Sequence, residues 1–385
     1  MNRSAVTVVP ISNTFRSRGH TFPATSEHTP ELRHGPAWPD DGAVTGFRSA
    51  VEVSRGFYAE VIRPVVEVPH AAGLLGWGSD VLGYDTERSM DHGWGPRLHV
   101  FVDDVEPVRA AIERNLPEEY DGHAVRFGWD AHEPTHHITV TTLSGWLVDH
   151  LGFDAGKGVG LEDWMVTPQQ QLLGVVAGAV YADDGRLEPV RAALQWYPDE
   201  LWRWLLTCQW SRIAQEEPFV QRTHQVGDEL GSRVVATRLV RDLMRLGLLQ
   251  ARAYAPYTKW LGTAFARLGH ADGLDRVLAE VLAAGDHADR ERALTTAYGL
   301  VARRHNALGI TPEVDPSPRQ FHDRPALVLG AERFVDACQA TVTDPRVRAL
   351  GMFGAIDQFA DNTDLLSNPS AYRKLIGAFR PPAGA

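Results

Sequence analysis

The sequence has little cysteine and no long hydrophobic run. Cys208 and Cys338 are the two cysteines among 385 residues, and they lie far apart in segments expected to be helical. A disulfide framework is therefore not expected, and a reducing compartment, the cytoplasm, fits this composition. No apolar stretch approaches the roughly 18 residues that a membrane-spanning helix needs, so no membrane partner is expected. Residues 1–20 also lack the apolar segment of a secretory signal.

Positive charge is also scarce. The chain carries 38 lysines and arginines against 49 aspartates and glutamates, which gives a formal net charge of −11. Such a surface repels a phosphate backbone, so no nucleic acid partner is expected. A small charged ligand stays compatible with this balance, provided that a local basic pocket receives it.

The chain is long enough for two domains, and its composition and apolar periodicity change along its length. Residues 1–45 contain Pro, Ser, His and Gly without periodicity, as in a flexible tail. Residues 46–155 mix helical and strand-like segments, whereas residues 156–385 read as a series of long helices. The predicted fold class is therefore α+β: a small α/β domain followed by a larger all-helical domain. In the first domain we expect helices over 47–66 and 105–116 and strands over 69–75, 98–102 and 137–143.

One glycine-containing stretch carries a pattern suited to phosphate chemistry. A short apolar segment ends in Gly78-Ser79, and Asp91 follows twelve residues after the serine. Glycine lets the backbone approach a phosphate, and the serine with its neighbouring amides can donate hydrogen bonds to it. Asp91, just before the next expected strand, would hold a divalent cation. Arg97 has a planar guanidinium that suits phosphate. The alternatives are an ordinary tight turn for Gly78-Ser79, a cap for Asp91 and a salt bridge for Arg97.

Transfer of a nucleotidyl group needs a triphosphate cradle, Mg²⁺ and a positioned acceptor. The carboxylates that hold the metal must share one face of adjacent strands, where side chains alternate with a period of two. The second acid is expected two residues after Asp91, and that position is Gly93. The expected strand over 137–143 supplies no acid either. The Mg²⁺ site is therefore incomplete in sequence, with Asp80, Asp85 and Glu87 as nearby candidates to compensate.

These motifs resemble those of a bacterial family of unassigned function that carries a DNA polymerase β-type nucleotidyltransferase core. The resemblance covers nearly everything after residue 46. It implies an N-terminal nucleotidyltransferase-like domain at 46–155 and a C-terminal helical domain similar to that of antibiotic nucleotidyltransferases. In that family an aspartate often follows the Asp-His pair at 91–92, and Gly93 replaces it here. The motifs that carry the resemblance include Gly78-Ser79-Asp80, Asp91-His92, Gly95-Pro96-Arg97, Gln169-Gln170-Gln171, Trp196-Tyr197-Pro198, Gly227-Asp228-Glu229 and Tyr257-Thr258-Lys259-Trp260.

Two positions of the helical domain are candidate site residues. Asp228 and Glu229 open a long expected helix, where acids interact favourably with the helix dipole. The resemblance to antibiotic nucleotidyltransferases suggests instead that one of them acts as the general base for the acceptor. Tyr257 and Lys259 could bind the nucleotide, with the lysine on the triphosphate and the aromatic group stacked on a base. The alternative is an amphipathic core helix with a lysine that reaches out to solvent.

His132-Glu133-Pro134-Thr135-His136 matches the zinc-protease pattern H-E-x-x-H. That chemistry needs both histidines on one face of a helix, and a central proline followed by a β-branched strand is incompatible with it. We interpret this segment as a loop.

The sequence therefore predicts a nucleotidyltransferase-like enzyme that transfers a nucleoside monophosphate from an NTP to a small-molecule hydroxyl or amine. Gly78, Ser79, Arg97, Tyr257 and Lys259 would bind the nucleotide, and Asp91 would hold Mg²⁺. One alternative is a catalytically degenerate protein that binds a nucleotide or another ligand, and a second is reuse of the fold for another reaction in specialised metabolism. The expected partners are the NTP and the acceptor, and a homodimer is expected by analogy alone.

Overall fold

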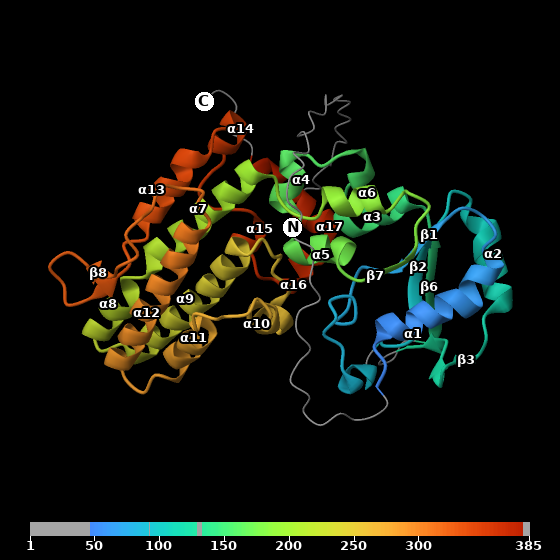
Figure 1. The fold of residues 1–385 in the computed structure, drawn as a ribbon, viewed down its shortest axis with the longest axis horizontal. Coiled ribbons are helices and arrows are strands. Elements are labelled where there is room, and N and C mark those ends of the chain that lie inside the picture. Colours follow the sequence, from blue (N-terminus) through green and yellow to red (C-terminus); the bar gives the residue numbers. More distant parts are fainter. Residues whose placement is uncertain (1–46, 92, 129–132, 380–385) are drawn as a thin grey trace, which may run out of the picture.

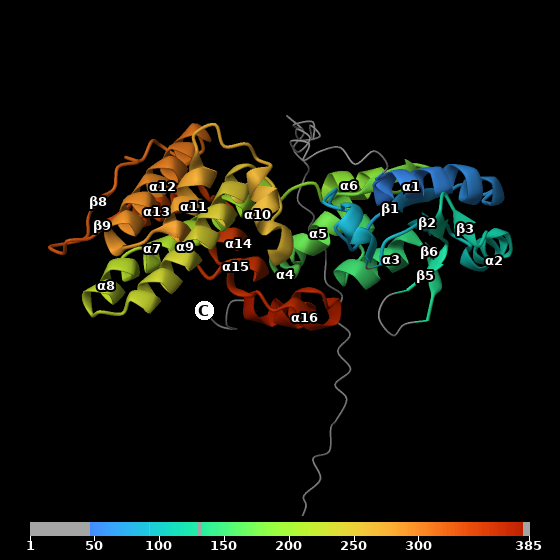
Figure 2. The ribbon, with the colours of Figure 1, turned by 90° about the horizontal axis from the view of Figure 1, so that it is seen from below.

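The computed structural model describes residues 47–379, apart from residues 92 and 129–132 and the side chain of Asp91. The molecule is elongated, with a sheet at one end and a bundle of long helices at the other (Figure 1). Shorter helices, among them α4, α5 and α15, lie between these two ends. The view from below shows the same order (Figure 2).

A five-stranded mixed sheet organises the first part of the chain. Its strand order is β5-β6-β2-β1-β7, and β2 and β6 are parallel while the other neighbours are antiparallel. The strands predicted over 69–75, 98–102 and 137–143 correspond to β1, β2 and β6, each found within two or three residues of the expected bounds. The five strands are β1 (Ala71–Leu74), β2 (Arg97–Phe101), β5 (Arg126–Phe127), β6 (Thr135–Thr141) and β7 (Ala179–Ala182). Two further pairs are β3 (Glu119–Tyr120) with β4 (His123–Ala124), and β8 (Arg319–Gln320) with β9 (Leu327–Val328).

Alternation along β2 explains how the sheet is covered. Leu98 and Val100 are buried in a cluster that also contains Phe57 and Ile112, from the helices on one face. Phe101, which points the other way, packs with Trp146 in the larger core cluster. The helices on these two faces are α1 (Ala50–Phe57), continued by η1 (Tyr58–Ile62) and η2 (Arg63–Val65), then α2 (Val105–Asn115) and α3 (Leu143–Leu151).

The rest of the chain is mainly helical, and its core is aromatic. Trp202, Trp204 and Trp210 of α7 are at most 3% exposed, so they are core residues. The long helices α7, α9, α12 and α13 pack against one another. The remaining elements are η3 (Glu87–Asp91), η4 (Ala155–Lys157), α4 (Leu161–Val166), α5 (Gln169–Val176), α6 (Glu188–Ala193), α7 (Asp199–Glu216), α8 (Phe219–Gln225), α9 (Glu229–Gln250), α10 (Thr258–Ala266), α11 (Leu274–Ala283), α12 (His287–Ala307), α13 (Glu332–Thr341), α14 (Pro345–Arg348), α15 (Ile356–Phe359), α16 (Thr363–Leu366), α17 (Pro369–Tyr372) and η5 (Arg373–Phe379).

The fold is α+β, as predicted, but the sheet extends past the boundary expected near residue 155. Strand β7 pairs with β1 and so belongs to the sheet. The large core cluster also runs without a break from Ala71 to Phe379. One face of the sheet therefore shares a hydrophobic core with the helical region, while the other face packs in the separate cluster of Leu98 and Val100. The predicted tail at 1–45 lies outside the described residues.

Two further sequence expectations concern helices. Within the described ranges, no helix combines the length and the apolar character needed to cross a bilayer. His136 belongs to β6 and bonds Glu113 through Nε2 at 2.6 Å, which agrees with the rejection of a zinc-protease helix there. His132 lies outside the described residues.

Candidate functional site

The glycine turn after β1 is held in place by backbone contacts. Gly76 and Gly78 have φ angles of 86° and 123°, in the region that side chains disfavour. The amide of Gly76 donates to the carbonyl of Gly174 at 2.7 Å, which fixes the turn to α5. The amide of Tyr84 donates to the carbonyl of Ser79 at 2.7 Å and closes the loop that follows. The predicted turn at Gly78-Ser79 is therefore present, with Ser79 half-buried at its surface.

Arg97 and Asp80 form a pair directly beneath this turn. Arg97 Nε lies 2.8 Å from Asp80 Oδ2, and Nη2 lies 2.6 Å from Asp80 Oδ1. Nη2 also bonds the carbonyl of Trp77. The Asp80 side chain is 6% exposed and that of Arg97 17%, so this is a largely buried bridge. A Cβ on Gly78 would lie 2.0 Å from Asp80 Oδ1 and 2.5 Å from Arg97 Nη2. Glycine at position 78 is therefore required for the pair to sit against the backbone.

The sheet face next to the turn carries basic and aromatic side chains. Arg97 pairs in register with His137, and His99 pairs with Thr139. Residues in register on neighbouring strands point to the same face, so these four side chains share the face beside the turn. This face presents a guanidinium, two imidazoles and a hydroxyl.

His99 is kept neutral by its surroundings. Burial, followed by the charges of Arg97 and His150, lowers its pKa to about 3. Its ring packs against Trp146 at 5.3 Å, and its Nδ1 has no hydrogen-bond partner among the described residues. His137 donates through Nε2 to the carbonyl of Phe127 at 3.0 Å, and burial lowers its pKa as well. Both imidazoles are therefore neutral near pH 7.

The acids near the turn are already engaged. Asp80 is paired with Arg97 and also accepts from the amide of Val81 at 3.0 Å. Asp85 Oδ2 accepts from the amide of Ala50 at 2.8 Å and from Trp94 Nε1 at 3.1 Å. In the part of the chain that the structure describes, no cluster of three or more His, Cys, Asp or Glu side chains is arranged to hold a metal ion. Asp91 ends η3, and because its side chain is outside the described part, its Mg²⁺ role stays a prediction.

Helix α10 and the segment before it reach the loop that follows the turn. Arg267 Nη2 donates to the carbonyl of Gly83 at 2.7 Å, and its guanidinium stacks 4.0 Å from the Tyr84 ring centroid. The Tyr84 and Trp260 rings are 5.1 Å apart. Lys259 is exposed, with Nζ 4.9 Å from the Trp260 ring centroid. Lys259 is thus next to Trp260, the residue whose ring contacts the loop after the turn.

Tyr257 is the second predicted residue that comes near the turn. Its amide donates to Gln170 Oε1 at 3.0 Å, which holds it against α5. Burial and the charge of Asp80 both raise the pKa of its hydroxyl, while a bond from Trp260 lowers it. The structure therefore brings Gly78, Ser79, Arg97, Tyr257 and Lys259 to one region. Sequence reasoning did not single out Arg267, since an arginine in an exposed helical turn carries no visible signal.

Asp228 and Glu229 lie elsewhere. Asp228 caps α9, with Oδ1 accepting from the amide of Gly231 at 2.8 Å. Glu229 bonds Arg290 at 2.9 Å and Arg233 at 3.0 Å. Helix α9 has 22 residues and is thus about 33 Å long. Asp228 and Glu229 lie at its N-terminus, whereas Tyr257 follows its C-terminus. The structure does not bring these acids to the turn: Asp228 is a helix cap, and Glu229 is the partially exposed partner of the buried Arg290.

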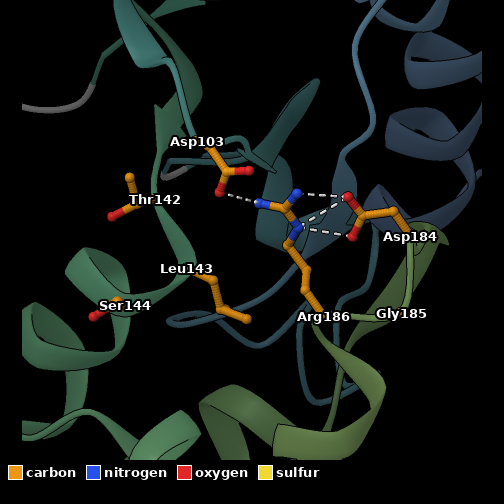
Figure 3. Close-up of a pocket in the computed structure, with 7 residues that line it drawn as sticks. All are labelled: Asp103, Thr142, Leu143, Ser144, Asp184, Gly185 and Arg186. Atoms are coloured by element: carbon orange, nitrogen blue, oxygen red, sulfur yellow. Dashed lines mark hydrogen bonds and ion pairs between the residues drawn. The ribbon is translucent and has the colours of Figure 1, made fainter.

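A pocket of about 440 Å³ lies at the other end of β2 and β6. Figure 3 shows Arg186 between two aspartates. Its Nη2 is 2.6 Å from Asp184 and its Nη1 is 3.0 Å from Asp103. The guanidinium is thus already paired on two sides, and the pocket offers an incoming anion no unpaired charge.

Comparisons with known proteins give two similarities. Residues 164–261, less than half of the chain, match the model of a family described as a domain of unknown function (DUF4037). Among solved structures, the chain is similar to a nucleotidyltransferase-like protein from Exiguobacterium sibiricum 255-15. The identity is 13%, the TM-score is 0.31, and the match covers 77% of this chain and 91% of that chain. No curated protein matches. The first similarity agrees with the expected resemblance to a family of unassigned function.

Proposed function

We propose that this protein binds the phosphate groups of a nucleotide at the Gly78-Ser79 turn and does not depend on a metal to do so. The observation that carries the proposal is the sheet face beside the turn. Arg97, His99, His137 and Thr139 are in register there, and β6, where a further metal-binding acid was expected, presents His137 and Thr139 instead. Arg97 is paired with Asp80, so this face offers an anion neutral imidazoles, a hydroxyl and a fixed guanidinium as hydrogen-bonding groups, with no metal needed.

Each part of the turn region has a role in this proposal. The amides around Gly78 and the hydroxyl of Ser79 donate to phosphate oxygens. Arg97, whose charge is balanced by Asp80, supplies a fixed guanidinium donor, and the exposed Lys259 supplies a mobile positive charge. Trp77 and Tyr257 are 48% and 42% exposed, which is unusual for large aromatic side chains. They offer surfaces on which a nucleobase can stack.

Nucleotidyl transfer is the second candidate, and one observation favours it. Asp91 ends η3, just before β2, so a carboxylate is available on the chain entering the sheet face. In this version Asp91 would hold Mg²⁺, which would neutralise the triphosphate and polarise the phosphoryl group. Asp228 and Glu229 have no part in it, because they are at the far end of α9.

Calorimetric titration of ATP separates the two candidates. We expect equal affinity with Mg²⁺ and with excess EDTA. Gly78→Val should weaken binding at least about tenfold, because the side chain occupies the space next to Arg97. Gly185→Val is the matched control, since Gly185 also has a positive φ but has open space around it.

Binding that requires Mg²⁺, accompanied by pyrophosphate release, would establish the transfer reaction instead. Absence of ATP binding in both conditions would refute both candidates.

A further inference from the structure

A second pocket, of about 400 Å³, lies in the helical region and is lined by four arginines. Arg212 comes from α7, and Arg238, Arg241 and Arg245 come from α9. The three α9 residues are spaced by three and four positions, so they form one stripe along the helix. The segment 357–361, which begins within α15, closes the pocket on the other side, and Asp242, Asp357 and Asp361 also line it. The pocket thus gathers guanidinium groups from two helices in a protein with a net negative charge.

Acidic side chains pair with these arginines and balance part of their charge. An anionic ligand can take the place of an acid whose ion pair is exposed. Arg241 Nη1 is 3.1 Å from Asp361, whose side chain is 70% exposed. Arg238 bonds Glu216 at 2.6 Å, with the Arg238 side chain 56% exposed and that of Glu216 17%. An ion pair as exposed as Arg241–Asp361 contributes little to stability, so an anionic ligand can displace or bridge it. The acids Glu216 and Asp242 belong to the interior, with the Arg212–Asp242 pair at 3.3 Å and Asp242 4% exposed.

Arg245 carries an unused hydrogen-bond donor. Its Nε is buried and has no partner among the described residues, while its Nη1 bonds the carbonyl of Asp357. A buried donor without an acceptor destabilises the folded protein, more so when the group is charged. Burial lowers the pKa of Arg245, while the charges of Asp357 and Asp242 raise it and those of Arg241 and Arg212 lower it. An anion in the pocket would supply the missing hydrogen-bond acceptor.

We propose that this arginine pocket binds a phosphate or diphosphate group of a small-molecule ligand. Guanidinium groups match phosphate oxygens through paired hydrogen bonds, and four of them surround a volume typical of ligand sites. Phe359, 45% exposed at the edge, supplies an apolar contact for the rest of the ligand.

The arginine pocket is separate from the glycine turn. Helix α5 lies between them: Asp357 accepts from the amide of Gln169 at its start, and Gly174 near its end accepts from Gly76. No residue lining the pocket belongs to the turn region. The two proposals therefore rest on different side chains and can fail independently.

Titration of pyrophosphate into the full chain tests the proposal, in EDTA and at one fixed ionic strength. Arg241→Gln and Arg238→Gln should each weaken binding at least about tenfold, because each removes a charged hydrogen-bond donor from the pocket. Arg276→Gln makes the same charge change on α11, where the arginine is 77% exposed and pairs with Glu280. That control should bind like the unaltered protein. The far-ultraviolet circular dichroism of each variant verifies that it is folded.

Arg245→Gln is a stronger test but is also at risk of unfolding, since Arg245 bonds the backbone of Asp357. The two more exposed arginines therefore decide the outcome. Lack of pyrophosphate binding to the unaltered protein overturns the proposal, and so does equal weakening by Arg276→Gln. Gly78→Val should still bind pyrophosphate, and adding Arg241→Gln should still weaken that binding. A loss of that binding in Gly78→Val would assign the anion to the glycine turn instead.

Discussion

At the residue scale, Gly78 has the most restricted position in the turn. Its φ of 123° is strained for any side chain, and an added Cβ would overlap both Asp80 and Arg97. We expect Gly78→Ala to lower the free energy of unfolding by about 3 kcal/mol or more, as strain and overlap combine. Gly185→Ala, with φ of 96° and nothing within 4 Å of the added Cβ, carries the strain alone. Urea denaturation of the two variants measures the difference, and equal losses would mean that Asp80 and Arg97 move aside freely.

The Asp80–Arg97 bridge should matter more than other ion pairs of the chain. Asp80→Ala leaves a guanidinium largely buried without its partner, and we expect a loss of about 3 kcal/mol in unfolding free energy. Glu280→Ala removes the partner of Arg276 in a pair whose side chains are 77% and 58% exposed, and should change stability by less than about 0.5 kcal/mol. The double variant Asp80→Ala/Arg97→Met should regain part of the loss. If it is no more stable than Asp80→Ala, the two side chains act independently and the bridge is not the cause.

The same residues show how far the sequence could be interpreted. The Gly78-Ser79 turn was predictable, because glycine and serine after a short apolar strand are a local signal. The partner of Arg97 was not predictable, because Asp80 is seventeen positions away and is brought close only by the path of the chain into β2. Asp228 illustrates the reverse case. Its capping role was visible in the sequence as an alternative, while its distance from the turn follows from the length of α9.

At the element scale, strand and helix positions were predicted best where the pattern is long. The sequence predicts helices over 198–215 and 228–251, and α7 at 199–216 and α9 at 229–250 fall within one residue of these bounds, because their apolar periodicity extends over several turns. Strand β7 was missed. It has four residues between helical segments, and four residues are too few to distinguish a strand from the end of a helix. Only the pairing of β7 with β1 identifies it.

The contact between α10 and the loop after the turn depends on one side chain. Arg267 joins the two through the carbonyl of Gly83 and the ring of Tyr84. We expect Arg267→Leu to increase hydrogen exchange at the amides of residues 80–86 at least about tenfold, because local opening no longer breaks these contacts. Arg276→Leu is the control on the neighbouring helix. Unchanged exchange in Arg267→Leu would show that the Tyr84–Trp260 ring contact alone holds the loop.

At the scale of the whole molecule, one core links the sheet to the helices, so buried ionisable groups in either part affect global stability. Burial lowers the pKa of His99 to about 3 and that of His150 to about 4. His305, in the helical part, has its pKa lowered to about 4 by burial. Glu217 acts in the opposite direction, because burial raises its pKa to about 7 despite bonds from the amides of Leu329 and Ala331.

These shifts set the sign of the pH dependence. Below about pH 6.5 the unfolded chain protonates each histidine while the folded protein does not, so each buried histidine lowers stability as the pH falls, by up to about 1.4 kcal/mol per pH unit. Glu217 instead takes up its proton in the folded state as the pH falls through about 7, and so stabilises the fold at acid pH. Burial also lowers the pKa of His137 and His287 and raises that of Glu216 and Asp357, so five histidines stand against three acids, and the unfolding free energy should decrease from pH 7 to pH 5. His99→Gln should make this decrease smaller, whereas His322→Gln, at an exposed position, should leave it unchanged. Urea denaturation at pH 7, 6 and 5 gives the slopes. An identical slope in His99→Gln and the unaltered protein would mean that His99 is protonated in the folded state, which would make the sheet face beside the turn more positive than described.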